Sequence, residues 1–475
     1  IKGADSISIS KINTFNFVSK VEKVYDYSLI LKKNKKYSNK DLNVDFESIK
    51  QGSEKYKGLS KINSTQIIIE ENQNFGYSFE QNNVIGIDYL HNCGFKGTGV
   101  DIAVLDAGYI NADKLQIFDS LFQRNRIKGF KDFDDVGKTV FNSSLHGTMV
   151  LSVMGGNIPG IYYGAAPCSN YWLLRTENAL SEFIVEEDNW IAAAEYADSI
   201  GADIINSSLG YTVFDDSTQS YKYKDMDGKT ARISKAADIA VAKGLFVVNS
   251  AGNSGAYEWK YIGAPADAQG VVSVGAIDLK RRLASFSSVG PTFDGRIKPD
   301  LVAPGLGVAA SNYNNDIISV NGTSFSSPIL AAGVACLMQA FPDKTNVEIN
   351  KALKESASKA FNPDFNYGYG IVNFAAAFKI LSGKEININM DNFMISPNPF
   401  SENISIIIHS YDSSEVVIDI YDINGKKVYN TNNVYKLKGY TYILLKDLET
   451  LSNGLYYLTI TSNNSFVKRK LMKIN

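Results

Sequence analysis

The chain contains few of the residues that would define its class by composition alone. Its 475 residues include three cysteines and three histidines. Cys93, Cys168 and Cys336 are widely spaced and odd in number, so they allow one disulfide at most and fit no zinc motif. Charge is nearly balanced, with 48 Lys and Arg against 50 Asp and Glu, so nothing indicates nucleic acid as a partner. The apolar runs are too short to span a bilayer, and no transmembrane segment is expected.

The pattern of apolar runs predicts an α/β fold. In four segments a glycine precedes a short β-rich apolar run, and a turn of small or polar residues follows: Gly99–Gly108, Gly201–Gly210, Gly244–Asn253 and Gly270–Ala276. Continuous apolar runs are typical of central parallel strands that are covered on both faces. Helical patterns lie between them, at Asp188–Ile200 and Ser234–Lys243. The alternation predicts a central, mostly parallel sheet with helices on both faces.

The character of the chain changes at both ends of this region. After about Gly383, short strands with turn signals predict a small antiparallel β-sandwich; the strands are expected at Ile404–His409, Val416–Tyr421 and Gly454–Ile460. Residues 31–74 are rich in Lys and Asn with weak periodicity, which is typical of a linker. The expected domains are therefore 75–383 and 395–475, joined by a linker at 384–394.

The stretch Asn321–Phe341 combines a polar start with an apolar continuation. Ile329–Met338 carries no charge and predicts a helix buried on all sides, in which Cys336 would be a small core residue. Ser324, at the head of this helix, could cap it by satisfying an amide. It could also be a nucleophile, placed where the helix dipole favours developing negative charge. The second interpretation requires a base, an orienting acid and an oxyanion site elsewhere in the chain.

A base can be sought by elimination among the three histidines. His409 falls in a C-terminal strand and His91 at a predicted helix end, whereas His146 is followed by Gly-Thr and an apolar, helix-like run. A lone histidine is usually structural, and Asp106 could be a turn residue at the end of its strand. A carboxylate at that place can also orient an imidazole and stabilise its charged form. The chain order Asp106, His146, Ser324 matches one of the known orders of a catalytic triad.

The motifs around these residues resemble those of the subtilases, the subtilisin-like serine endopeptidases. LDAG, HGTMV and GTSFSSP are similar to the family's Asp, His and Ser motifs, and SSLG, NSAGNSG, KPDLVAPG and YGYGIVN also match, all in family order. The resemblance covers roughly Phe75 to Gly383. The α/β-hydrolases do not fit, because Ser324 is not in a G-x-S-x-G motif and their His follows the Ser.

The resemblance implies a role for each residue. Ser324 attacks the peptide carbonyl and forms an acyl-enzyme, His146 transfers the proton, and Asp106 orients the imidazole. Asn253 donates to the oxyanion from its side chain. Protein or peptide substrates would bind as an added strand between two cleft edges. One edge is implied at Ser208, Leu209 and Gly210, and the other at Ser250, Ala251 and Gly252.

Several positions depart from the family pattern. Ala107 stands where the family usually has Ser or Thr, Met149 where many relatives have a second His, and Phe325-Ser326 where Met-Ala is usual. None of these removes a catalytic group, which argues against a non-catalytic peptide-binding relative. The loop Gly155–Gly164 does not match the calcium-binding loop of secreted subtilisins. The chemistry needs no cofactor, no metal ligand is assigned, and a structural calcium at another place is left open.

The two ends resemble targeting segments. Ser6–Val24 resembles the end of a subtilase inhibitory prodomain, which predicts a prodomain tail at 1–30; a disordered leader fits equally well. The Pro397–Pro399 opening, the Asn424-Gly425 turn and the basic Lys468–Lys473 strand resemble a type IX secretion sorting domain. The protein's own prodomain and the type IX secretion machinery are then expected partners. The protein is expected to be secreted by a Gram-negative bacterium or held on the surface of its cell. An adhesive β domain is the alternative.

Overall fold

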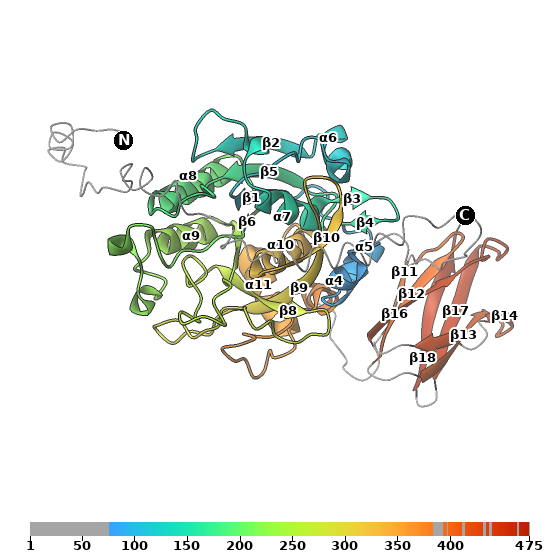
Figure 1. Ribbon diagram of the computed structural model, residues 1–475. Helices are drawn as coiled ribbons and strands as arrows, with labels where there is room; N and C mark the ends of the chain where they lie inside the picture. Colours follow the sequence, from blue (N-terminus) through green and yellow to red (C-terminus); the bar gives the residue numbers. More distant parts are fainter. Residues whose placement is uncertain are drawn as a thin grey trace. The chain divides into compact units, whose positions relative to one another are not determined.

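The computed structural model describes residues 76–382, 393–396, 398–410, 414–430, 434–436, 439–462 and 465–474. The chain divides into two compact units between Ser382 and Gly383 (Figure 1). The predicted prodomain tail at 1–30 and the predicted linker at 31–74 lie outside the described residues, as does most of the predicted linker at 384–394.

An eight-stranded sheet forms the centre of the first unit, in the order β10-β9-β8-β7-β6-β1-β5-β2. Every neighbouring pair is parallel except β10 and β9. The strands are β1 (Asp101–Asp106), β2 (Ile127–Asp132), β5 (Asn170–Arg175), β6 (Ile204–Ser207), β7 (Phe246–Ser250), β8 (Val272–Asp278), β9 (Leu301–Ser311) and β10 (Ile317–Asn321). The four predicted strands are β1, β6, β7 and β8, which are adjacent in the middle of the sheet.

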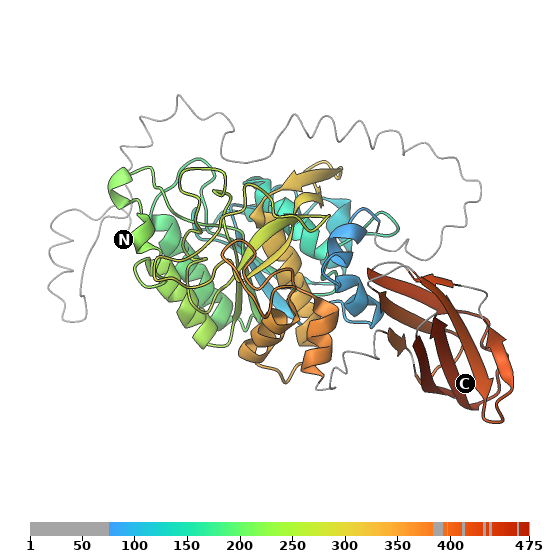
Figure 2. The same cartoon turned by 90° about the horizontal axis from the view of Figure 1, so that it is seen from below.

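Helices cover both faces of this sheet, as predicted (Figures 1 and 2). On one face lie α8 (Val185–Ser199) and α9 (Arg232–Ala242), where Trp190 shares a buried cluster with Leu105 and Val247. On the other lie α7 (His146–Gly155) and α10 (Thr323–Ala340). The helices predicted from the sequence begin at Asp188 and Ser234, which are three and two residues after the observed starts of α8 and α9. In the part of the chain that the structure describes, the other helices of four or more residues are α4 (Phe79–Asn83), α5 (Ile87–Asn92), α6 (Asp119–Gln123), α11 (Asn346–Ser356) and α12 (Phe374–Leu381).

Helix α10 is the central helix of the first unit. All its residues from Thr323 to Leu337 are buried, which confirms the predicted burial on all sides. With 18 residues, it is the one helix in the described part of the chain that is long and apolar enough to cross a membrane. The expectation of no transmembrane segment had counted only the shorter apolar run within this helix. Because 83% of the helix is buried inside the protein, it fits a core helix. Cys336 is buried in it, and all three cysteines are free.

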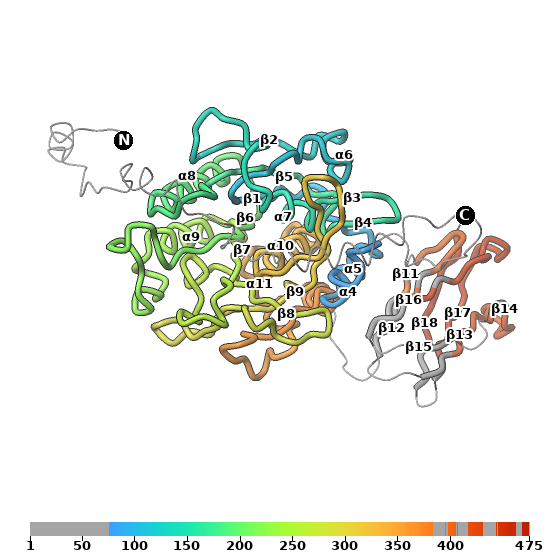
Figure 3. The backbone as a smooth tube through the Cα atoms, viewed as in Figure 1, coloured from blue at the N-terminus to red at the C-terminus, as the bar shows by residue number. Residues whose placement is uncertain are grey.

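The second unit consists of two antiparallel sheets (Figure 3). One has the order β11-β12-β16; in the other, the order is β14-β13-β17-β18 and β15 also pairs with β13. Ile406 and Leu445 of the first sheet share a buried core with Ile418 and Leu458 of the second, which confirms the predicted sandwich. The strands are β11 (Phe393–Ser396), β12 (Ile404–Ser410), β13 (Ser414–Asp422), β14 (Lys427–Asn430), β15 (Val434–Lys436), β16 (Gly439–Leu445), β17 (Gly454–Ser462) and β18 (Ser465–Lys473).

Candidate active site

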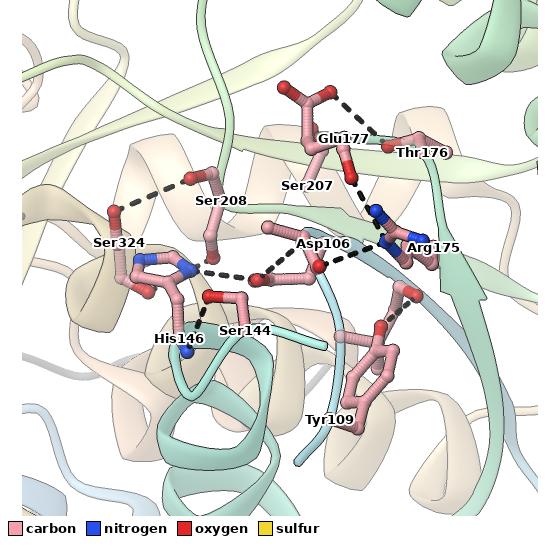
Figure 4. Close-up of polar contacts among 12 residues, drawn as sticks. Asp106, Tyr109, Ser144, His146, Arg175, Thr176, Glu177, Ser207, Ser208 and Ser324 are labelled. Carbon is pink, nitrogen blue, oxygen red and sulfur yellow. Dashed lines mark hydrogen bonds and ion pairs between the residues drawn. The ribbon is translucent and has the colours of Figure 1, made fainter. Parts of the chain in front are cut away.

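A buried carboxylate and an imidazole meet where β1 ends and α7 begins. The Nδ1 atom of His146 donates a hydrogen bond of 2.8 Å to Oδ1 of Asp106 (Figure 4). The Asp106 side chain is fully buried, and 15% of the His146 side chain is exposed. Gly147 permits this approach, because a Cβ there would lie 2.4 Å from the carbonyl oxygen of Gly108 and 3.0 Å from Cβ of Asp106. The carboxylate therefore fixes the orientation of the ring.

Burial and charge act in opposite directions on the pKa of His146. Burial lowers this pKa, while the charge of Asp106, its hydrogen bond and the charge of Glu177 raise it. The net effect places the pKa above its ordinary value of 6.5. The site thus favours the imidazolium, the form that a general base adopts after it accepts a proton.

Ser324 is the second residue of α10 and lies beside the His146–Asp106 pair (Figure 4). The ring of its neighbour Phe325 packs 6.0 Å from the ring of His146. Oγ of Ser324 donates to the carbonyl oxygen of Ser208 at 3.3 Å, and Oγ of Ser208 donates to the carbonyl oxygen of Ser324 at 3.0 Å. The N-cap is Gly322, and no side chain caps the helix. The cap interpretation of Ser324 is therefore wrong: its hydroxyl contacts another segment.

The amide of Asn253 is oriented by the residue before Ser324. Both the backbone N–H and Oγ1 of Thr323 donate to Oδ1 of Asn253, at 2.9 Å and 3.0 Å. With the oxygen engaged by two donors, the Nδ2 hydrogens are directed to another acceptor. Asn253 and Ser324 line the same cavity, so an oxygen held there could receive the amide hydrogens. Sequence analysis missed Thr323, although its hydroxyl next to Ser324 was a usable signal.

One cavity of about 160 Å³ brings the two predicted edges together. Its lining includes all six predicted substrate-binding residues, Ser208, Leu209, Gly210, Ser250, Ala251 and Gly252, in addition to Asn253 and Ser324. The edges extend from the carboxyl ends of β6 and β7, which are neighbours in the sheet. Nδ2 of Asn249 donates to the carbonyl oxygens of Leu209 and Ser250, at 2.9 Å and 2.8 Å, and so joins the edges. Sequence analysis missed other lining residues from loops, Thr212, Ser254, Tyr261, Gly263 and Ser288.

An arginine beside Asp106, with 12% of its side chain exposed, was not predicted either. Arg175 ends β5 and is the register partner of Asp106. Its guanidinium pairs with Asp132 and Asp134, at 2.8 Å each, and its Nε donates to the carbonyl oxygen of Ala107 at 3.2 Å. The backbone N–H of Ala107 donates in turn to Oδ1 of Asp106 at 2.8 Å. Arg175 therefore holds the peptide that follows Asp106.

The loop that was expected not to match the calcium-binding loop of secreted subtilisins contains a short hairpin. Within Gly155–Gly164, β3 (Asn157–Ile158) pairs with β4 (Tyr162–Tyr163). In the described part of the chain, the side chains that could together hold a metal ion are elsewhere, at Glu177, Glu182 and Glu186.

The fold and the site together define an α/β serine protease. Residues 97–370 match the profile of the Subtilase family, and residues 394–474 match the Secretion system C-terminal sorting domain. The chain therefore belongs to the subtilase family. Subtilisin DY from Bacillus licheniformis is 29% identical over 297 residues, which are 62% of this chain and 96% of that protein. Alkaline elastase YaB from Bacillus sp. (strain YaB) is 31% identical over 286 residues, 60% of this chain and 66% of that protein.

Solved structures show the same fold. MycP1 from Mycobacterium smegmatis is 22% identical with a TM-score of 0.50, covering 66% of this chain and 87% of that one. Prenylagaramide maturation protease PagA is 23% identical with a TM-score of 0.50, covering 63% of this chain and 99% of that one. The protein is thus a subtilisin-like serine protease with a sorting domain at its C-terminal end, and that domain implies secretion or a place on the cell surface.

Proposed function

We propose that the protein is an endopeptidase in which Asp106, His146 and Ser324 form the catalytic triad and Asn253 supplies the side-chain donor of the oxyanion hole. The observation that supports this most is the 2.8 Å hydrogen bond from His146 to the buried Asp106. It holds the imidazole beside a serine that lies at a helix N-terminus and lines a cavity.

The mechanism follows from these positions. Oγ of Ser324 turns from the Ser208 carbonyl oxygen towards His146, which takes its proton as Oγ attacks the scissile carbonyl carbon. The carbonyl oxygen becomes an oxyanion and accepts hydrogen bonds from Nδ2 of Asn253 and from the backbone N–H of Ser324. His146 then protonates the leaving amine, and water hydrolyses the acyl-enzyme by the same steps. Asp106 stabilises the imidazolium in both halves, and no cofactor enters these steps.

The substrate is an extended peptide that lies between the two cleft edges. Ser208–Gly210 and Ser250–Gly252 consist mostly of small residues and line one cavity. Small side chains let a peptide backbone approach the edge backbones closely enough to pair with them as a strand.

The competing function is peptide binding without cleavage, and active-site labelling separates the two. Intact mass would be measured after exposure to a fluorophosphonate, on the wild type and on Ser324→Ala, with any N-terminal inhibitory segment cleaved and washed away. One adduct on the wild type and none on the variant is expected. A folded wild type without an adduct would rule out an activated Ser324 and leave the binding function.

The sorting domain is proposed to act in type IX export across the outer membrane of a Gram-negative bacterium. In this proposal residues 1–30 are the tail of the protein's own inhibitory prodomain, and residues 395–475 are the domain that directs export. Residues 31–74 and 384–394 are linkers. Removing Asp391–Asn475 should abolish export and leave peptidase activity intact. Normal export with loss of surface binding would instead identify the domain as an adhesin.

A further inference from the structure

Three glutamates bring their carboxylates together beside the active site. Glu177 follows β5, Glu182 lies in the next loop, and Glu186 is in the first turn of α8. One carboxylate oxygen from each lies within 4.8 Å of the other two. Glu177 is 7% exposed and Glu186 is 1% exposed, so the space they share is largely closed to water.

A helix N-terminus alone does not explain this arrangement. Acidic residues in a first turn are stabilised by the helix dipole, and α8 has three of them, Glu186, Glu187 and Asp188. Glu187 is equally buried, but it accepts a hydrogen bond from Tyr221 at 2.8 Å and lies 3.6 Å from Arg232. Glu186 is directed instead towards two other carboxylates, where a negative charge is costly.

The described residues do not compensate the negative charge of Glu186. Its Oε2 atom is buried without a hydrogen-bond partner among them. Arg175 donates from Nε to the carbonyl oxygen of Glu177 at 3.1 Å, but its terminal nitrogens pair with Asp132 and Asp134. Among the described residues, no cationic side chain therefore pairs with Glu186.

We propose that Glu177, Glu182 and Glu186 bind one hard divalent cation of the calcium class. Oxygen ligands lie about 2.3–2.6 Å from Ca²⁺, so any two of them can be at most about 5 Å apart, and the observed separation of 4.8 Å or less meets this limit. Tyr211 donates a hydrogen bond to Glu177, which leaves the other oxygen of that carboxylate for the ion. Such outer contacts orient metal ligands.

The cation would join the loop before α8 to one edge of the cleft. The backbone N–H of Asp215 donates to the carbonyl oxygen of Glu182 at 2.8 Å, and Tyr211 directly follows the cleft-edge residue Gly210. Both contacts link the glutamate cluster to the segment that continues from Ser208–Gly210. Binding of the ion is independent of cleavage and can be measured on an inactive protein.

The test uses the full chain with Ser324→Ala, which prevents self-digestion, and Tb³⁺ as the probe. Tb³⁺ replaces Ca²⁺, and its luminescence can be excited through a nearby tyrosine such as Tyr211. Saturable emission that Ca²⁺ displaces is expected. Adding Glu186→Gln should weaken Tb³⁺ binding at least about tenfold, because it removes one ligand charge. The matched control is Glu195→Gln, an exposed glutamate on the same helix, which should bind like the parent.

Two results would overturn the proposal. One is a parent protein with no saturable emission, and the other is Glu186→Gln binding as tightly as the parent. In either case a proton shared between the carboxylates would explain their proximity. Circular dichroism checks that each variant is folded. If Glu186→Gln does not fold, Glu182→Gln replaces it, since that side chain is only partly buried.

Discussion

Oγ of Ser324 donates its hydrogen bond to the carbonyl oxygen of Ser208, 3.3 Å away, on the edge where substrate is proposed to pair. A peptide that pairs with this edge competes for the same carbonyl oxygen. Its binding would release the hydroxyl, which can then turn to His146. Catalytic hydrogen bonds often form only in the substrate complex, and in the proposed mechanism one backbone atom would connect substrate binding to activation of Ser324.

Replacing Asn253 should slow turnover and leave substrate binding largely unchanged. Asn253→Ala removes the oriented Nδ2 donor, which acts on the oxyanion and not on the ground-state carbonyl. The expected loss in kcat is about 10²–10³-fold, a range taken from the equivalent donor in subtilisin itself. Steady-state kinetics on a peptide ester or amide would measure it, with KM changed little.

A graded control comes from the residue that orients this amide. Thr323→Val keeps the backbone donor to Oδ1 of Asn253 but removes the Oγ1 donor at 3.0 Å. One neutral hydrogen bond contributes about 0.5–1.5 kcal/mol, so kcat should fall by roughly tenfold or less. Equal losses in the two variants, or a change confined to KM, would contradict the oxyanion role of Asn253.

The pH dependence of activity should follow the charges around His146. In the proposed mechanism the neutral imidazole is the active base, and its pKa lies above 6.5, so kcat/KM should rise with pH through a value above 6.5. Glu177 is one of the anions that raise this pKa. Glu177→Gln should therefore lower the pKa and move the acid limb to lower pH. The profile would be measured in a chelator, so that no bound cation neutralises the carboxylate.

Glu195→Gln controls for a general effect of removing a glutamate, because Glu195 is exposed on the far part of α8. Its profile should coincide with that of the wild type. An unchanged or upward-shifted acid limb in Glu177→Gln would mean that this carboxylate does not act on His146.

The carboxylate of Asp106 has one oxygen that a substitution could satisfy. Oδ2 is buried without a hydrogen-bond partner among the described residues, next to Ala107, where the family usually has a hydroxyl residue. Ala107→Thr should supply a donor and raise the free energy of unfolding by about 1 kcal/mol. Urea denaturation of inactive Ser324→Ala protein would measure the change. Ala107→Val has the same shape without the hydroxyl, so an equal gain in that variant would show that packing, and not a hydrogen bond, is responsible.

The sequence was most informative where one segment carries its own signal. The strands β1, β6, β7 and β8 are continuous apolar runs, and all four could be predicted. The edge strand β2 has a single buried residue, Asp132, and β9 contains Pro304, Gly305 and Gly307, so neither shows a continuous apolar run.

The site residues also divide into those that lie in a local sequence motif and those that do not. Asp106, His146, Ser324 and Asn253 each lie in a short motif, and the structure brings them to one place. Arg175 and Glu177 have no motif. Their positions follow from the pairing of β5 with β1, which the sequence did not reveal. The first turn of α8, which contains Glu186, lay before the predicted start of that helix, so the glutamate cluster could not be predicted.

A charge network at the start of β9, around the buried Lys298 and Asp300, gives the last prediction, which concerns stability. Lys298 is 2% exposed, and its Nζ donates to Asp300 at 2.7 Å; Lys354 lies 2.8 Å from the other oxygen of Asp300. Burial raises the pKa of Asp300, but the charges of Lys298 and Lys354 outweigh it and hold this pKa well below its ordinary value. Lys298→Met should lower the free energy of unfolding at pH 7 by about 3 kcal/mol, because it leaves a buried carboxylate with one cationic partner, Lys354, beside the hydrogen bonds from Ser273.

The size of the pH effect separates this network from a surface ion pair. A carboxylate with a depressed folded pKa stabilises the protein above its unfolded pKa of about 3.9, and this stabilisation is lost as pH falls below that value. Wild-type stability should therefore fall steeply on acidification, and Lys298→Met should show a weaker fall. Lys351→Met is the control, because Lys351 is largely exposed and lies 3.8 Å from Glu355; it should change stability by less than about 0.5 kcal/mol. Urea unfolding of Ser324→Ala protein at a series of pH values measures both effects, and parallel curves for wild type and Lys298→Met would show that Asp300 does not depend on this lysine.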